Sequence, residues 1–194
     1  MNVPNTITFI RIALIPVLVL TFYLPGKWSP FVCSGIFALA AFTDWLDGYL
    51  ARNLKQTSQL GTFLDPVADK LIVAVALVLV VSENTFSFIA IPACIIVGRE
   101  IVISALREWM AEIGKRASVA VSYIGKLKTF FQMISLIILL AFRPGSWYQH
   151  GIGWYLLGII GYGLLCIAAA MTLWSMLIYL KTAWPDLTLH QKQQ

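Results

Sequence analysis

Long apolar runs alternate with short polar segments along the whole chain. Six of these runs approach or exceed the ~20 residues that a helix needs to cross a lipid bilayer. They predict membrane-spanning helices over about 7 to 24, 31 to 50, 65 to 82, 86 to 106, 124 to 142 and 152 to 180. The last run is longer than one span requires, which predicts a helix that tilts or projects past the membrane.

The composition supports this reading of the pattern. The 194 residues are 59% hydrophobic and only 12% charged, with a mean hydropathy of +0.81, which excludes an ordinary soluble domain. The first run contains Arg11 and no Ala-x-Ala-like site follows it, so we expect a helix there and not a signal peptide. The connections are short, which predicts one all-α membrane domain over residues 1–194.

The basic residues predict the orientation of the helices. Alternate connections are poor in Lys and Arg and hold only Lys27 and Arg143. The other connections and ends hold Arg52, Lys55, Arg107, Lys115, Arg116, Lys126, Lys128, Lys181 and Lys192. By the positive-inside rule the second set faces the cytoplasm, so both termini should be cytoplasmic in an inner-membrane protein. Lys and Arg residues that anchor the protein beside anionic lipid also explain much of the net charge of +5. The charge therefore does not require a nucleic-acid partner.

Four carboxylates stand out against the apolar background. Asp44 and Asp47 lie three residues apart near the end of the second run, and Asp65 and Asp69 lie four apart at the start of the third. On helices, each pair projects from one face. Since one charge at a bilayer centre costs about 2.5 to 3.5 kcal/mol, four need compensation by cations or water. Two facing pairs would make an all-oxygen cage in a polar cavity open to the cytoplasm, which suits Mg²⁺, Mn²⁺ or Ca²⁺ better than Zn²⁺.

Spacing alone leaves other functions open for these carboxylates. Paired acidic residues within membrane helices also occur in proton relays and ion pathways. A divalent-cation transporter would be expected to have Gly or Pro breaks at matching positions of two inverted halves. The chain has no such symmetry, and the site formed by the four Asp residues is confined to one end of the predicted bundle.

The residues between the carboxylates complete a longer motif. The chain reads Asp44-Trp-Leu-Asp47-Gly48-Tyr-Leu-Ala51-Arg52 and, after eight residues, Gly61-Thr-Phe-Leu-Asp65-Pro-Val-Ala-Asp69. This matches D-x2-D-G-x2-A-R-x8-G-x3-D-x3-D at every fixed position and resembles the signature of the CDP-alcohol phosphotransferases. The early Pro4-Asn5-x-Ile7-Thr8-x-x-Arg11 and the later Arg99-Glu100, Ser104–Trp109 and Gly125–Thr129 segments extend the resemblance. They are similar to the bacterial branch that moves the phosphatidyl group of CDP-diacylglycerol onto glycerol 3-phosphate and releases CMP.

The resemblance implies roles for individual residues. Asp44, Asp47, Asp65 and Asp69 would hold two divalent ions, Mg²⁺ or Mn²⁺, and Asp69 would also act as the general base. Such ions neutralise phosphoryl oxygens and stabilise a leaving group. The CDP-diacylglycerol site would comprise Asn5, Thr8, Gly48, Arg52, Ser58 and Gly61. Without the resemblance, the small residues would be equally consistent with close helix packing, and Arg52 with an interfacial anchor.

Glycerol 3-phosphate carries its own phosphate and therefore needs a second group of cations. Arg99 lies within the fourth apolar run, and Arg107 lies eight residues later on roughly the same helical face. With Lys126 and Lys128 they form the expected acceptor site. The alternative is that Arg99 pairs with Glu100 or an Asp and that the two Lys are anchors. Because adjacent helical residues face different directions, Arg99 and Glu100 need not pair.

Two further questions remain open at the level of sequence. An enzyme of the same family could use another acceptor, as cardiolipin or phosphatidylserine synthases do, although an acceptor without a phosphate would leave the basic residues without a ligand. A series of glycines begins the last run and predicts a close helix interface, either within the chain or in a homodimer. These glycines are Gly151, Gly153, Gly158, Gly161 and Gly163.

Overall fold

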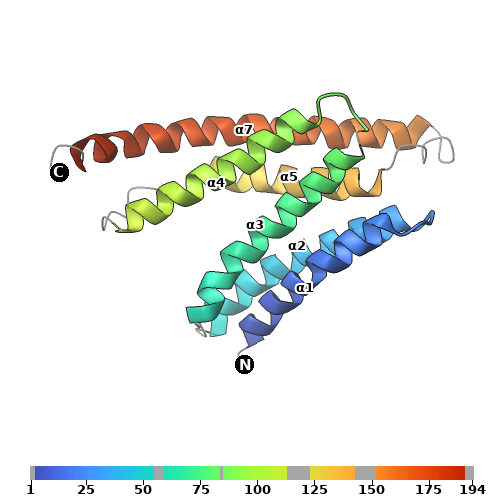
Figure 1. Cartoon of the computed structure of the whole chain (residues 1–194), viewed down its shortest axis with the longest axis horizontal. Helices are drawn as coiled ribbons and strands as arrows, with labels where there is room; N and C mark the ends of the chain where they lie inside the picture. The colour runs from blue at the N-terminus through green and yellow to red at the C-terminus, as the bar shows by residue number, and fades with distance from the viewer. Residues whose placement is uncertain (1–2, 55–58, 84, 113–122, 143–151, 191–194) are drawn as a thin grey trace.

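The computed structural model describes residues 3–54, 59–83, 85–112, 123–142 and 152–190, and it gives only the backbone at several helix ends. Six helices and no strand occur in these segments, which confirms the all-α prediction for the described part of the chain. In chain order they are α1 (Val3–Tyr23), α2 (Ser29–Leu54), α3 (Gln59–Ser82), α4 (Ala90–Glu112), α5 (Tyr123–Ala141) and α7 (Ile152–His190) (Figure 1).

A tight connection joins α1 to α2. Pro25 and Gly26 follow the end of α1, and the amide of Ser29 donates to the Gly26 carbonyl at 3.3 Å. The Ser29 hydroxyl donates to the Thr21 carbonyl at 2.6 Å, so it bonds one of the last carbonyls of α1. Pro30 then occupies the first turn of α2, where its missing N–H costs nothing. The two helices therefore run back along each other as a hairpin.

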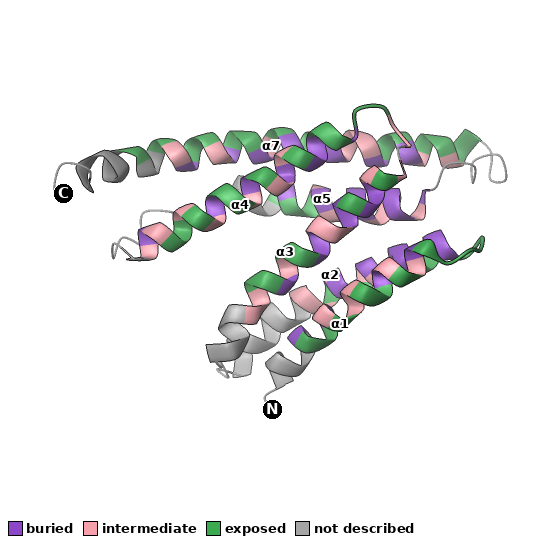
Figure 2. Cartoon of the chain, viewed as in Figure 1, coloured by how far each residue is buried: buried purple, intermediate pink, exposed green. Residues whose placement is uncertain are grey.

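The apolar core is shared by helices distant in sequence. α5 packs extensively against α7 and α2, while α1 packs against α2 and α3. Side chains that are fully buried in this core come from five helices: Leu18, Cys33, Ala76, Leu136 and Leu165. Figure 2 shows α7 exposed along its outward side and buried where it faces α4 and α5. The core thus joins α1, α2 and α3 along the parts nearest the α1–α2 connection, and the carboxylates lie beyond it toward the other ends of these helices.

Two of the predicted interface glycines pack within the chain. A Cβ atom added to Gly158 would lie 2.8 Å from the Phe142 ring, and one added to Gly161 would lie 2.7 Å from Cγ2 of Ile138. The Ser135 hydroxyl donates to the Gly161 carbonyl at 2.7 Å. Gly153 and Gly163 have open space instead, and Gly151 lies outside the described residues. The close approach at Gly158 and Gly161 is therefore between α5 and α7 of one chain.

The helices extend beyond the apolar runs that predicted them. α2 continues to Leu54, α3 begins at Gln59, and α7 continues to His190. Hydropathy marks only the part of a helix that lipid would cover, so polar helical turns at the ends are missed. Among the described helices, Ile152–Lys181 is the one segment long and apolar enough to cross a membrane. Shorter apolar stretches occur at Thr8–Tyr23, Ser29–Asp44 and Leu127–Ala141.

Candidate active site

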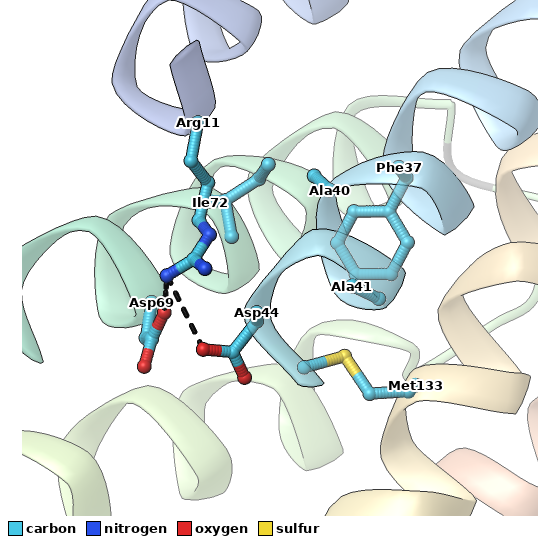
Figure 3. A pocket seen from close by; sticks show the side chains of 8 residues that line it. All are labelled: Arg11, Phe37, Ala40, Ala41, Asp44, Asp69, Ile72 and Met133. Atoms are coloured by element: carbon cyan, nitrogen blue, oxygen red, sulfur yellow. Dashed lines mark hydrogen bonds and ion pairs between the residues drawn. The ribbon is translucent and has the colours of Figure 1, made fainter. Parts of the chain in front are cut away.

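Arg11 lies between two carboxylates that belong to different helices. Its side chain is buried, with 1% of its surface exposed. Nη1 of Arg11 donates to Oδ1 of Asp69 at 2.5 Å and lies 3.2 Å from Oδ1 of Asp44 (Figure 3). A charge in an apolar helix is stable only when it is paired, and one guanidinium here serves both α2 and α3. Asp44 and Asp69 thus converge from two helices on one point.

A second contact joins α1 to α3 one turn away. The Thr8 hydroxyl, which is buried, donates to Oδ1 of Asp65. Thr8 and Arg11 are three residues apart on α1, and Asp65 and Asp69 are four apart on α3. Both pairs therefore lie on facing sides of their helices and form two successive polar contacts. This arrangement fixes the direction in which the two α3 carboxylates point.

The charges of the described side chains at this site do not balance. Among them, one guanidinium faces the carboxylates of Asp44 and Asp69, which leaves an excess negative charge. These carboxylates are 44% and 41% exposed, whereas Arg11 is buried, so their free oxygens remain accessible. The site can therefore accept a cation on its open side.

A small pocket adjoins the ion pairs. Its empty volume is about 240 Å³, which includes open solvent at its mouth. Arg11, Asp44 and Asp69 provide its polar wall. The remaining wall is apolar and comes from α2, α3 and α5: Phe37, Ala40, Ala41, Ile72 and Met133 (Figure 3). The apolar side chains limit the access of water to one side of the pocket. The carboxylates on the other side are then the groups that can take part in chemistry.

The donor set fits a hard divalent cation. All of its atoms are carboxylate oxygens, which Mg²⁺ and Mn²⁺ prefer. Within the described residues, no three acidic, His or Cys side chains lie close enough to hold a metal ion by themselves. Asp47, the remaining member of the predicted quartet, lies on the described backbone of α2, but its side chain is outside the described residues. The predicted four-carboxylate metal site therefore stays a prediction.

A basic cluster, here meaning Arg99, Arg107 and Lys128, lies on α4 and α5. Nη1 of Arg99 donates to Oε1 of Glu100 at 2.8 Å, and Nζ of Lys128 lies 3.5 Å from the same oxygen. The structure thus shows the Arg99–Glu100 pair, the alternative that the sequence left open. The long Arg99 side chain reaches back to its neighbour although the two Cβ atoms point in different directions.

α7 contributes to the basic cluster as well. Nη2 of Arg99 donates to the Ser175 hydroxyl at 3.4 Å. The guanidinium carbons of Arg99 and Arg107 each lie 5.9 Å from the centre of the Tyr179 ring, within the range of cation–π interactions. Arg99 and Lys128 are buried, whereas Arg107 is exposed. Arg99 and Lys128 thus form the buried part of the cluster, and Arg107 provides one accessible guanidinium.

A hydrogen bond joins the helix of Asp65 and Asp69 to the helix of Arg99 and Arg107. Lys70, which follows Asp69 in α3, donates from Nζ to the Ser104 hydroxyl of α4 at 2.5 Å. Ser104 lies between Arg99 and Arg107 in the sequence, and its own hydroxyl bonds the Glu100 carbonyl at 2.5 Å. Lys70 is exposed, and it joins the helix of the carboxylates to the helix of the arginines.

Several predicted site residues cannot be compared with the structure. Ser58 lies outside the described residues. Other positions have a described helical backbone, but their side chains are not described: Asn5, Gly48, Arg52, Gly61 and Lys126. Their proposed roles therefore stay predictions.

The site residues predicted from the sequence did not include three residues that lie in the two sites. Arg11 could have been found, because a single cation in an apolar run requires an anionic partner. Glu100 was considered only as a partner of Arg99, yet it also lies near Lys128. Tyr179 carried no recognisable signal, since aromatic residues are common throughout the apolar runs.

Comparisons with known proteins identify the family of the chain. A relative from Yersinia enterocolitica, a CDP-diacylglycerol--glycerol-3-phosphate 3-phosphatidyltransferase, is 54% identical over 96% of this chain and 97% of its own length. Relatives of the same name occur in Pseudomonas fluorescens, at 54% identity over 96% and 92% of the two chains, and in Shigella flexneri, at 52% over 96% and 97%. The model of the CDP-alcohol phosphatidyltransferase family matches residues 1–174. The chain therefore belongs to the CDP-alcohol phosphatidyltransferase family.

Proposed function

We propose that this chain transfers the phosphatidyl group of CDP-diacylglycerol to glycerol 3-phosphate, giving phosphatidylglycerophosphate and CMP in phospholipid biosynthesis. The observation that carries the proposal is the convergence of Asp44 and Asp69 at Arg11 in a chain that is 54% identical to relatives named for this reaction. The basic cluster on α4 and α5 adds a place for a phosphorylated acceptor.

The reaction requires one bond to form and one to break at phosphorus. A hydroxyl oxygen of glycerol 3-phosphate attacks the phosphorus that bears diacylglycerol. The bond from that phosphorus to the CMP oxygen breaks, and CMP leaves with the bonding electron pair. A base must take the hydroxyl proton. Asp69 is our candidate, because its carboxylate is accessible and is held in place by Arg11.

Divalent ions would complete the charge balance at the carboxylates. Asp44, Asp47, Asp65 and Asp69 would hold two Mg²⁺ or Mn²⁺ ions, and such ions neutralise phosphoryl oxygens and stabilise a leaving phosphate. The site would suit these ions for two reasons. Its ligand atoms are all carboxylate oxygens, and negative charge is in excess beside Arg11. Arg11 would orient Asp44 and Asp69, and Thr8 would orient Asp65.

The donor and acceptor would bind on opposite sides of the carboxylates. We assign the nucleotide and its phosphates to the cytoplasmic ends of α1, α2 and α3, through Asn5, Thr8, Gly48, Arg52, Ser58 and Gly61. Small residues there let a flat base approach the backbone. Thr8 would contribute mainly by fixing Asp65, since its hydroxyl already donates to that side chain.

We assign the acceptor phosphate to the basic cluster together with Lys126. Among the described residues, Arg99, Arg107 and Lys128 outnumber the carboxylate that lies among them, that of Glu100. The remaining positive charge complements a phosphate monoester, which carries about two negative charges at neutral pH. An acceptor without a phosphate would leave this charge without a partner.

The surface of the helices favours a lipid environment. Large apolar side chains are more than half exposed on several helices, among them Leu20, Val78, Ile101 and Trp174. Such exposure is unfavourable in water and is ordinary against acyl chains. We therefore propose one domain with six spans in the bacterial inner membrane, both termini in the cytoplasm and an active site open to the cytoplasm and to lipid.

A test of the proposal is to vary the acceptor. The purified protein is incubated with CDP-diacylglycerol and Mg²⁺ or Mn²⁺, and CMP release is measured with glycerol 3-phosphate, glycerol, serine or phosphatidylglycerol. We expect rapid CMP release with glycerol 3-phosphate only. Equal or faster release with serine or phosphatidylglycerol would overturn the assignment of the acceptor.

A further inference from the structure

Tyr179 connects the two arginines of the basic cluster. It lies on α7, near the end of the segment long enough to span a membrane, and 8% of its surface is exposed. Its ring centre is 5.9 Å from the guanidinium carbon of Arg99 and 5.9 Å from that of Arg107. The arginines are eight residues apart on α4, about 12 Å along the helix axis. One aromatic ring therefore draws two distant guanidinium groups toward a common point.

The contact belongs to a small platform on α7. Ser175, one turn before Tyr179, is buried and accepts a hydrogen bond from Arg99 at 3.4 Å. Ser175 and Tyr179 are four residues apart and thus lie on one face of α7, toward α4. The family match ends at residue 174, just before both platform residues.

We propose that Tyr179 is a positioning residue that holds Arg99 and Arg107 as a pair for the phosphate of the acceptor. The inference rests on the proposed function. Arg99 has additional partners in Glu100 and Ser175. Arg107 is exposed, so its side chain would otherwise sample many rotamers, and ordering it before binding lowers the entropy lost when phosphate binds. The ring face, and not the hydroxyl, supplies the attraction.

The test compares the aromatic ring with an aliphatic side chain. Tyr179→Leu removes the ring, and Tyr179→Phe keeps it without the hydroxyl. We expect Tyr179→Leu to raise the KM for glycerol 3-phosphate about 3- to 30-fold, the scale of a partly buried cation–π interaction, with little change in kcat or in the KM for CDP-diacylglycerol. Tyr179→Phe should retain a KM close to that of the wild type.

Controls separate this role from a general effect on α7. Trp174→Leu removes an exposed aromatic side chain from the same helix and should leave the acceptor KM unchanged. In an Arg107→Gln background, Tyr179→Leu should have a smaller effect than in the wild type, because one partner of the ring is already absent. If Tyr179→Leu does not fold, Tyr179→Met provides a flexible aliphatic replacement for the same comparison.

Three results would overturn the inference. They are an unchanged acceptor KM in the aliphatic variant, an equal rise in Tyr179→Phe, and equal weakening toward both substrates. Failure of the wild-type protein to use glycerol 3-phosphate at all would instead overturn the proposed function. The two failures are therefore distinguishable in one set of saturation curves.

Discussion

Arg11 of α1 and Asp69 of α3 are joined by a hydrogen bond of 2.5 Å, and the same Arg11 nitrogen lies 3.2 Å from Asp44 of α2. One buried guanidinium therefore organises carboxylates that are 25 residues apart in the chain. In the proposed enzyme this arrangement has two consequences. It keeps Asp44 and Asp69 together before any ligand binds, and it leaves a negative charge in excess for a cation.

Replacing Arg11 should therefore lower the stability of the fold and increase the stabilisation that divalent ions provide. Arg11→Met leaves Asp44 and Asp69 facing each other without a guanidinium. Breaking a buried pair costs about 3 to 5 kcal/mol, and partial exposure of both carboxylates reduces this to about 1 to 3 kcal/mol. We expect a lower unfolding temperature in detergent, together with a larger rise on adding Mn²⁺ than the wild type shows.

Arg11→Lys is the matched control for that measurement, because it keeps a cation but loses the planar donor group. Its unfolding temperature should lie between those of the wild type and Arg11→Met. An Arg11→Met protein as stable as the wild type, without added metal, would show that the ion pairs contribute nothing to the fold.

Metal removal tests the proposed role of the acidic residues. Treatment with a chelator should abolish CMP release, and Mg²⁺ or Mn²⁺ should restore it. Asp44→Asn and Asp65→Asn should each weaken Mn²⁺ binding, measured by electron paramagnetic resonance, and lose activity. Glu83→Gln, which changes a carboxylate near the other end of α3, should retain both properties. Full activity in a metal-free sample would contradict the proposal.

Arg107 tests the acceptor site. A charge-assisted hydrogen bond contributes about 1.5 to 3 kcal/mol, so Arg107→Gln should raise the KM for glycerol 3-phosphate about 10- to 100-fold. The KM for CDP-diacylglycerol should change little, and Arg107→Lys should be intermediate. Matched saturation curves for the two substrates provide the measurement. If both KM values rise equally, Arg107 shapes the cavity or binds the nucleotide instead.

The glycines of α7 provide a test of packing that is independent of activity. Gly161→Ala would place a Cβ atom 2.7 Å from Ile138, and such overpacking costs about 1 to 3 kcal/mol. Gly163→Ala meets open space in the same helix and should be neutral or stabilising by about 0.4 to 1 kcal/mol. Thermal unfolding of the two variants compares them directly. Equal stability would mean that α5 and α7 do not approach as closely as described.

The all-helical fold could be predicted from the sequence because each helix contains a long apolar run. Helix ends were less accurate, since polar turns such as the start of α3 at Gln59 continue a helix without adding to its hydropathy. The spacing of Asp65 and Asp69 correctly placed both on one face of α3, and the structure brings Asp69 to the guanidinium that also faces Asp44. The role of these residues as metal ligands stays a prediction.

Contacts between distant helices could not be read from local spacing. The partners of Arg11 depend on how α1 crosses α2 and α3, and the position of Tyr179 depends on how α7 packs on α4. The Arg99–Glu100 pair has a different origin, because it depends on a rotamer of a long side chain and not on the helical period. Periodicity identifies which residues share a face, but tertiary packing selects their partners.

The central claim is that phosphatidyl transfer takes place at the carboxylates beside Arg11, with Asp69 as the base. The most direct test is the rate of a single turnover by Asp69→Asn, measured together with equilibrium binding of CDP-diacylglycerol. Asn occupies nearly the same volume but cannot take the proton. We expect turnover to fall by at least about 100-fold while donor binding falls much less. Turnover near that of the wild type would contradict the claim and require another base.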